Sequence, residues 1–272
     1  MNKPKYTVVN FSGGKDSTAM LLRLIDFGTH IDEVVHFDVG KEFPAMYEHI
    51  AKVKKLVESN GIKFTTIRSE KSFDYLMFEH NAKRKDGDNS KVGLSWPGPR
   101  KRWCTSNLKG DLAKRYFSRL KKEYEVIQYI GIAFDELHRL QRKNNQDPNF
   151  AFPLVEWQWT EEQCLQYCYD NGFDFGGLYE VFRAPDGKCP RISCWCCPLQ
   201  SLDDLRILYR CFPELWQELK RMDSMTWQTF KPNYSVEQLQ VRFDLEQRYA
   251  EEGKPIRSNA FFDELRQTLR QK

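Results

Sequence analysis

The stretch "VVNFSGGKDSTAML" (residues 8–21) constrains the fold of this chain more than any other. A β-branched apolar run precedes two glycines, and apolar residues at helical spacing follow them. A strand that enters a helix through such a loop exposes backbone N–H groups at the helix N-terminus, where they bind anions. The loop has neither the Walker A spacing nor that of the dinucleotide fingerprint. It therefore predicts another kind of phosphate site, with a plain glycine turn as the alternative.

The remaining pattern predicts an α/β fold. Strands are expected at 5–11, 32–40, 62–70 and 125–134, with helices at 16–27, 43–61 and about 105–122 between them. Such alternation favours a parallel twisted sheet with helices on both faces. Thr160 and Gln163 form the capping box of a helix over 159–172. We therefore divide the chain into a nucleotide-binding domain, 1–172, and a cysteine-rich, mostly helical portion, 173–272.

Further segments narrow the interpretation. They are "VVHFDVGKEFPAMYE" (34–48), "RWCTSNLK" (102–109), "GIAFDELHR" (131–139) and "FPLVEWQWTEEQCLQY" (152–167). Together with "SGGKDS" they resemble, in the same order, the motifs of the phosphoadenosine phosphosulfate reductase family. This family belongs to the adenine nucleotide alpha-hydrolase-like, or PP-loop, superfamily. The resemblance covers roughly residues 5–170 and implies that the chain binds an adenine nucleotide.

The resemblance also implies site residues. The loop residues expected to hold phosphate or sulfate oxygens are Ser12, Gly13, Gly14, Lys15, Asp16 and Ser17, of which Lys15 and Asp16 are also catalytic candidates. Asp38, at a strand end, is expected to hold Mg²⁺ or the ribose, with a capping role as the alternative. Arg139 is a candidate phosphate or sulfate ligand, and a surface salt bridge is an equal alternative. Val39, Ala45, Met46 and Ala133 depart from the family pattern, which weakens the case for phosphosulfate.

The segment "CPRISCWCCP" (189–198) contains four of the eight cysteines. The Cys194-x-x-Cys197 spacing is that of a metal chelate, and four thiolates suit either zinc or an iron–sulfur cluster. The chain is similar here to assimilatory sulfate reductases and DNA phosphorothioation sulfur-transfer enzymes, which favours a [4Fe–4S] cluster with zinc as the alternative. The expected ligands are Cys104, Cys189, Cys194 and Cys197, with Cys196 as a substitute. Cys104 follows the basic run "RKRW" and is alternatively a reactive, catalytic thiol.

Other cysteines and one charged loop allow simpler interpretations. Cys164 and Cys168 lie at i and i+4 of one helix, and we expect them to be packed in the core, like Cys211. Residues 81–103 form a long loop rich in lysine and arginine that also carries Trp96 and Trp103. It is either a nucleotide or single-stranded nucleic-acid surface or a solvated loop.

The resemblance leaves three functions open. The leading one is ATP-dependent, Mg²⁺-assisted adenylation that releases pyrophosphate and prepares sulfur transfer, with a nucleic acid as candidate acceptor and a cysteine desulfurase as candidate partner. The second is reduction of phosphoadenosine phosphosulfate or adenosine phosphosulfate to sulfite, with thioredoxin as partner. Family reductases use a cysteine near the C-terminus, whereas residues 257–272 contain none, so this reaction is expected to lack its usual nucleophile. The third is a non-catalytic nucleotide-sensing partner.

Composition adds limits on location and partners. No apolar run reaches the roughly 18 residues of a membrane span, and the first residues lack a secretory pattern. We therefore expect a cytoplasmic protein without a membrane partner. The net charge of +4 does not by itself require a nucleic acid.

Overall fold

The computed structural model describes residues 3–81, 90–142 and 145–271. The chain forms two compact units, Met1–Phe73 with Trp103–Cys194, and Asp74–Arg102 with Trp195–Lys272. The division at residue 172 that the sequence suggests stays a prediction. In the structure, residues 173–194 group with the first unit, and the described residues between 74 and 102 group with the second.

The first unit is built on a five-stranded parallel sheet in the order β3-β2-β1-β4-β5. Its strands are β1 (Lys5–Phe11), β2 (Glu33–Asp38), β3 (Lys63–Arg68), β4 (Glu125–Ile130) and β5 (Phe150–Ala151). The register pairs Val8 of β1 with Glu33 of β2 and with Gln128 of β4. The predicted α/β fold and its parallel sheet are confirmed, and β5 is a short strand that the sequence did not predict.

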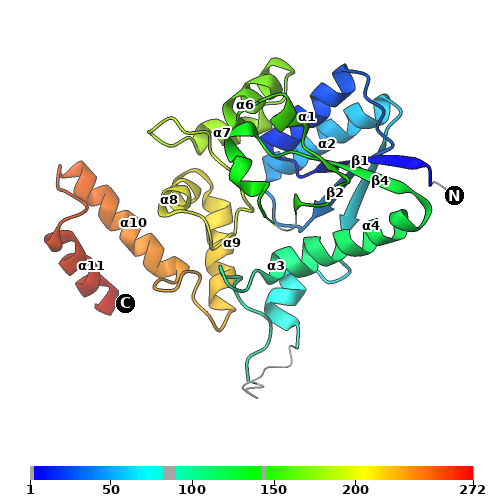
Figure 1. Cartoon of the computed structure of the whole chain (residues 1–272). Coiled ribbons are helices and arrows are strands. Elements are labelled where there is room, and N and C mark those ends of the chain that lie inside the picture. Colours follow the sequence, from blue (N-terminus) through cyan, green and yellow to red (C-terminus); the bar gives the residue numbers. More distant parts are fainter. Residues whose placement is uncertain (1–2, 82–89, 143–144, 272) are drawn as a thin grey trace. The chain divides into compact units, whose positions relative to one another are not determined.

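Helices cover both faces of this sheet (Figure 1). They include α1 (Lys15–Asp26), α2 (Pro44–Ser59) and α6 (Glu161–Asp170) on one face and α4 (Asp111–Glu123) on the other. Alternate residues of β1 serve the two faces, as the strand period requires. Val8 packs with Phe117 of α4, whereas the ring of Phe11 lies 6.4 Å from that of His49 on α2. The sheet is therefore buried on both sides, as parallel sheets generally are.

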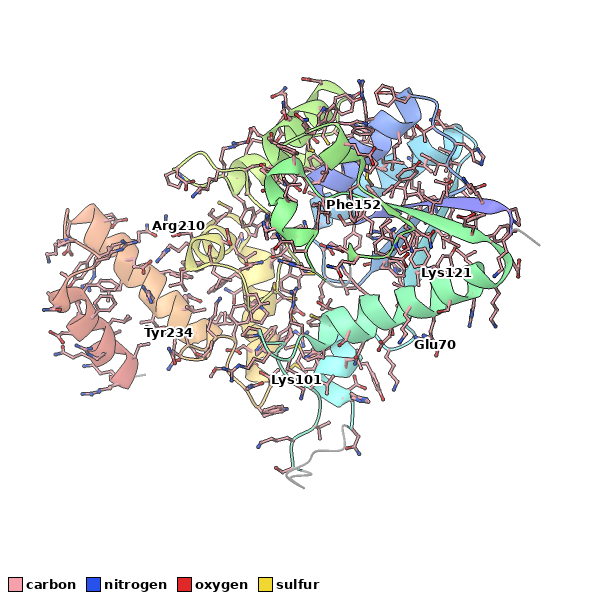
Figure 2. The ribbon with its side chains drawn as sticks, in the orientation of Figure 1. Glu70, Lys101, Lys121, Phe152, Arg210 and Tyr234 are labelled. Atoms are coloured by element: carbon pink, nitrogen blue, oxygen red, sulfur yellow. The ribbon has the colours of Figure 1, made fainter. Side chains whose placement is uncertain are left out.

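Short helices complete the first unit. They are α3 (Trp103–Thr105), α5 (Pro153–Glu156) and α7 (Leu178–Val181), with a π-helical turn at Ser106–Gly110 and 3₁₀ turns at Phe134–Arg139 and Phe175–Gly177. The capping box of α6 is confirmed, because Thr160 and Gln163 satisfy each other's backbone amides. Lys121 on α4, labelled in Figure 2, pairs with Asp147 at 2.9 Å. This ion pair holds α4 to the segment before β5.

At the amino-terminal end of the sheet, one carboxylate holds several elements together. Glu33 is fully buried, and its oxygens accept hydrogen bonds from Tyr116 at 2.6 Å and Tyr6 at 3.2 Å. Thr65 also donates to it, and Lys63 forms an ion pair with it at 2.9 Å. Glu33 therefore joins β1, β2, β3 and α4, which a buried charge can do only with several donors.

The second unit is mostly helical, as predicted. Its helices are α8 (Leu202–Cys211), α9 (Pro213–Ser224), α10 (Val236–Glu251) and α11 (Asn259–Gln271), with a π-helical turn at Tyr75–Glu79. Ser201 and Ser235 begin α8 and α10 with capping boxes. Tyr249 and Phe261 belong to a core that α10 and α11 share. Among the described residues, no helix has the length and apolarity that crossing a membrane requires.

Two tryptophans of the predicted long loop, residues 81–103, are buried, one in each unit. Trp96 donates to Asp223 at 2.8 Å and packs edge-on against Phe230, and Trp103 packs against Phe73. Only 5% of Trp96 and 4% of Trp103 is exposed, so these two rings fit neither alternative, a stacking surface or a solvated loop. The basic residues Lys83, Arg84 and Lys85 lie outside the described residues.

Candidate nucleotide site and thiol segment

The predicted loop lies between β1 and α1, at the carboxyl end of the central strand. Gly13 has a φ of +87°, and a Cβ there would come within 3.2 Å of Ile50. Gly131, just after β4, lies so close to α1 that a Cβ would approach the Cα of Ser17 to 3.0 Å. The glycines thus permit both the left-handed turn and the close approach of two backbone segments.

The loop hydroxyls hold the backbone of the loop itself. Ser17 Oγ accepts from the Ser12 amide at 3.1 Å and donates to the Gly14 carbonyl at 3.0 Å. Thr18 Oγ1 also lies 3.0 Å from that carbonyl and from His49 Nε2. The hydroxyls therefore fix the shape of the loop. An anion at the loop would meet the N–H groups of the first turn of α1, which have no intrahelical acceptors and of which that of Lys15 already donates to the Tyr179 hydroxyl.

Lys15 is turned inward. Its side chain is 2% exposed, and its ammonium lies 2.8 Å from Glu161 Oε1 and 3.1 Å from Asp16 Oδ1. Burial alone would lower the pKa of Lys15, but the carboxylates of Asp16 and Glu161 outweigh burial and raise it. For Asp16, burial is the larger effect and raises the pKa to about 6, although Lys15 opposes it. The loop lysine is thus charged and held by carboxylates.

Glu161, the first residue of α6, connects the loop with the cysteine segment. Its Oε1 accepts from Lys15 at 2.8 Å and from Arg191 Nε at 3.3 Å. Its backbone carbonyl lies 3.8 Å from the sulfur of Cys189, which donates to it. Arg191 also donates to Glu136. One residue therefore holds both the glycine loop and the start of the thiol segment, a role that the sequence did not reveal.

Three carboxylates meet at this point. Asp16, Glu136 and Glu161 each have one oxygen within 4.8 Å of the other two. Arg139, a predicted phosphate ligand, forms an ion pair with the buried Glu136, and its side chain is 32% exposed. Lys15, Arg139 and Arg191 therefore already pair with the three carboxylates. The role of Arg139 as a phosphate or sulfate ligand stays a prediction.

Asp38 lies at the end of β2 and is surrounded by donors. Its Oδ1 accepts from the Gly40 amide at 2.7 Å and from the Tyr47 hydroxyl at 3.1 Å, and Arg68 donates to Oδ2 at 2.7 Å. Burial would raise the pKa of Asp38, but these hydrogen bonds and the Arg68 charge lower it. The geometry is that of a strand-end cap. To bind Mg²⁺ or a ribose hydroxyl, the Asp38 carboxylate would have to give up one of these three hydrogen bonds.

The cysteines differ in exposure. Cys104, Cys189, Cys194 and Cys197, the four predicted ligands, are half-buried, whereas Cys164, Cys168 and Cys196 are buried and Cys211 is exposed. Burial raises the pKa values of Cys164 and Cys168, which pack on α6 as expected. The expectation that Cys211 belongs to the core is wrong, because it lies exposed at the end of α8.

The environments of two predicted ligands are well defined. Burial raises the pKa of Cys189 to about 11, and the nearby Arg191 is engaged by Glu136 and Glu161. Cys194 Sγ lies 3.8 Å from Glu42 Oε1, which also lies 3.8 Å from the Lys109 ammonium. Burial raises the pKa of Glu42.

A cavity of about 630 Å³ opens beside Cys189. It is lined by Asp135, Glu161, Glu162, Arg183, Gly187, Lys188 and Cys189. Of these residues, only Cys189 stands out in the sequence. The others belong to the 3₁₀ turn at Phe134–Arg139, to α6 and to the segment before the cysteines, whose proximity only the fold reveals.

Comparison with known proteins supports the resemblance. Residues 6–92 match the model of the phosphoadenosine phosphosulfate reductase domain, in agreement with the resemblance seen in the sequence over this range. An uncharacterized protein of Methanocaldococcus jannaschii is 25% identical over 232 residues, which make up 79% of this chain and 40% of that relative. This chain thus spans less than half the length of that protein.

One solved structure gives a weaker likeness. It is the U34-tRNA thiolase NcsA from Methanococcus maripaludis with its [4Fe-4S] cluster. The sequence identity is 17% and the TM-score is 0.39, and the match covers 81% of this chain and 71% of that one.

Proposed function

Because residues 6–92 match the phosphoadenosine phosphosulfate reductase domain, we propose that this chain is a nucleotide-dependent sulfur-transfer enzyme that adenylates its acceptor. The observation that supports this most is the junction at Glu161. It holds Lys15 of the loop at 2.8 Å and Arg191 of the thiol segment at 3.3 Å. A nucleotide activated at the loop would therefore lie close to a sulfur-bearing segment.

In the proposed reaction the loop orients ATP. The amides of the first turn of α1 and the Lys15 ammonium would hold the β- and γ-phosphates and align the α-phosphorus with an acceptor oxygen. The acceptor oxygen forms a bond to the α-phosphorus, and the bond to the bridging oxygen breaks as pyrophosphate leaves. Sulfide then forms a bond to the carbon that carries the adenylated oxygen, and the carbon–oxygen bond breaks as AMP leaves. A nucleic acid is the proposed acceptor, and a cysteine desulfurase is the proposed source of sulfur.

The chain offers residues for two bound groups. Asp16, Glu136 and Glu161 present oxygen donors of the kind that suits Mg²⁺, which would balance charge on the departing pyrophosphate. The ion would first have to displace the Lys15, Arg139 and Arg191 side chains that now pair with these carboxylates. The proposed ligands of a [4Fe–4S] cluster, with zinc as the alternative, are the half-buried Cys104, Cys189 and Cys194 of the first unit and the half-buried Cys197 of the second. Such a cluster would supply a binding position for the sulfur that is transferred. Cys104 is alternatively the thiol that carries this sulfur.

The reaction is tested by pyrophosphate release from ATP in the presence of sulfide and candidate nucleic acids. Lys15→Gln should lower the rate about a hundredfold, because a preorganised cation is lost. Lys54→Gln, at an exposed position of α2, is the matched control and should match the unaltered protein. No pyrophosphate release from the unaltered protein with any acceptor would refute adenylation.

The metal centre is tested by anaerobic purification, an absorption spectrum and metal analysis. Replacement of each of Cys104, Cys189, Cys194 and Cys197 by serine should lower the iron content, whereas Cys211→Ser should not, because Cys211 is exposed on α8. A colourless, zinc-loaded protein would overturn the iron–sulfur assignment.

The match to a reductase domain also favours a second candidate, reduction of phosphoadenosine phosphosulfate. Sulfite release in the presence of thioredoxin, without pyrophosphate release from ATP, would support this reaction. Tight nucleotide binding with neither product would instead support a nucleotide-sensing role.

A further inference from the structure

Tyr179, on the short helix α7, contacts the candidate phosphate loop. Its hydroxyl oxygen accepts a hydrogen bond from the Lys15 amide at 2.9 Å. The same oxygen lies 3.5 Å from the position that a Cβ on Gly14 would take. The ring is 2% exposed, so the phenol reaches the N-terminus of α1 from within the protein. No local sequence pattern marks this residue.

The backbone before α7 is built to place this ring. Phe175, Gly176 and Gly177 are three consecutive residues with positive φ, of 55°, 61° and 74°. A Cβ on Gly176 would come within 2.6 Å of the Cβ of Ala45, so the turn packs tightly against α2. The Tyr179 ring meets Phe175 edge-on at 4.8 Å. A non-glycine residue in the left-handed region costs energy, and such strain concentrates at functional turns.

The phenol still has a proton to donate. A tyrosine hydroxyl both accepts and donates, and here its oxygen accepts from Lys15. Among the described residues, no hydrogen-bond acceptor for the phenolic proton is present. Burial raises the pKa of Tyr179, so the hydroxyl is protonated at neutral pH. The Lys15 ammonium lies 5.8 Å from the ring centroid, which adds a positive charge near the hydroxyl.

We infer that the Tyr179 hydroxyl is an oxyanion-binding group that donates a hydrogen bond to a phosphate oxygen of the nucleotide held by the loop. This rests on the proposed function, in which the loop residues Gly13 to Ser17 hold that phosphate. The Lys15 amide fixes the phenol oxygen, so the hydroxyl proton is presented beside Gly14 without reorganisation. The inference adds a donor from outside the loop motif.

The test is binding of inorganic pyrophosphate and of ATP by calorimetry. Tyr179→Phe keeps the ring and removes only the hydroxyl, and it should weaken pyrophosphate binding about tenfold. Tyr169→Phe is the matched control, because its hydroxyl donates to Glu180 at the surface, and it should leave the affinity unchanged. Thermal unfolding of both variants establishes that they are folded.

A second measurement follows the phenol directly. With 3-fluorotyrosine incorporated, the ¹⁹F signal missing from Tyr179→Phe identifies residue 179, and this signal should shift when pyrophosphate is added. Unchanged or tighter pyrophosphate binding by Tyr179→Phe would overturn the inference, and tighter binding would mean that the hydroxyl competes with the ligand. If the unaltered protein bound neither pyrophosphate nor ATP, the proposed function itself would fail.

Discussion

The Lys15 ammonium lies 2.8 Å from the Glu161 carboxylate, which joins the start of α1 to the start of α6. Lys15 is 2% exposed, and Glu161 also accepts from Arg191. A buried lysine depends on its partners, because an unpaired charge inside a protein is costly. The contact is therefore expected to contribute to stability as well as to the site.

Replacing Glu161 by glutamine should lower the free energy of unfolding by about 2 kcal/mol. The buried Lys15 ammonium would then face a neutral amide oxygen instead of a carboxylate. Urea unfolding measures this change. Glu162→Gln is the matched control. Its side chain is 56% exposed and pairs with Arg183 at the surface, so a change under about 0.5 kcal/mol is expected. Equal effects of the two variants would show that the Lys15–Glu161 contact stabilises the fold no more than the surface pair of Glu162 with Arg183.

The strand–loop–helix order around the glycine loop was predictable from the sequence, because local spacing carries that information. Residues 8–21 alone indicate a strand, a left-handed glycine and a helix, and β1, Gly13 and α1 follow. The capping box at Thr160 was equally predictable, since its two partners are three residues apart.

Partners distant in the sequence were not predictable. Glu161 lies 146 residues from Lys15, and Tyr179 lies 164 residues from it. Their positions depend on how α6 and α7 pack against α1, which no local pattern encodes. At Trp96 and Trp103 a local pattern pointed to the wrong environment. A glycine- and proline-rich loop suggested exposed rings, but both side chains pack in the core of their units.

Gly93 makes a prediction about the second unit. It has a φ of +74°, and a Cβ there would lie 2.0 Å from the carbonyl oxygen of Met77. Gly93→Ala should lower the free energy of unfolding by at least about 2 kcal/mol, because the left-handed backbone and the clash both oppose it. Gly98→Ala, where no atom lies within 4 Å of the added Cβ, should change it by less than about 0.5 kcal/mol. Thermal or urea unfolding that ranks the variants otherwise would contradict this geometry.

His49 predicts a pH dependence of stability. It lies buried beneath the loop beside Thr18, and burial followed by the nearby Lys52 charge lowers its pKa to about 4. An unfolded histidine has a pKa of about 6.5. Between these values the unfolded chain binds more protons, so the contribution of His49 is complete above pH 6.5 and is lost as the pH falls toward 4. The loss is about 3 kcal/mol, at roughly 1.4 kcal/mol per pKa unit.

The measurement is urea unfolding at pH 6.5, 5.5 and 4.5, compared between the unaltered protein and His49→Gln. The comparison with His49→Gln is needed because Asp16, whose pKa is raised to about 6, changes the free energy of unfolding in the opposite direction over the same pH range. Stability of His49→Gln should fall less with decreasing pH. His30→Gln is the control, since the His30 side chain is 82% exposed, and it should keep the slope of the unaltered protein. An identical slope in His49→Gln would mean that His49 is not held neutral.

Glu33 leads to the prediction for the opposite end of the sheet. Burial would raise its pKa, but hydrogen bonds from Thr65 and Tyr116 and the Lys63 charge outweigh burial and lower it. In Glu33→Gln the amide group can accept through one oxygen only, so at least one buried donor loses its partner. We expect a loss of about 3 kcal/mol in the free energy of unfolding. Glu125→Gln, an exposed position of β4, should be nearly neutral. If Glu33→Gln proved as stable as Glu125→Gln, the carboxylate would not be what holds β1, β2, β3 and α4 together, and apolar packing of Val8, Val35, Phe117 and Val126 would have to suffice.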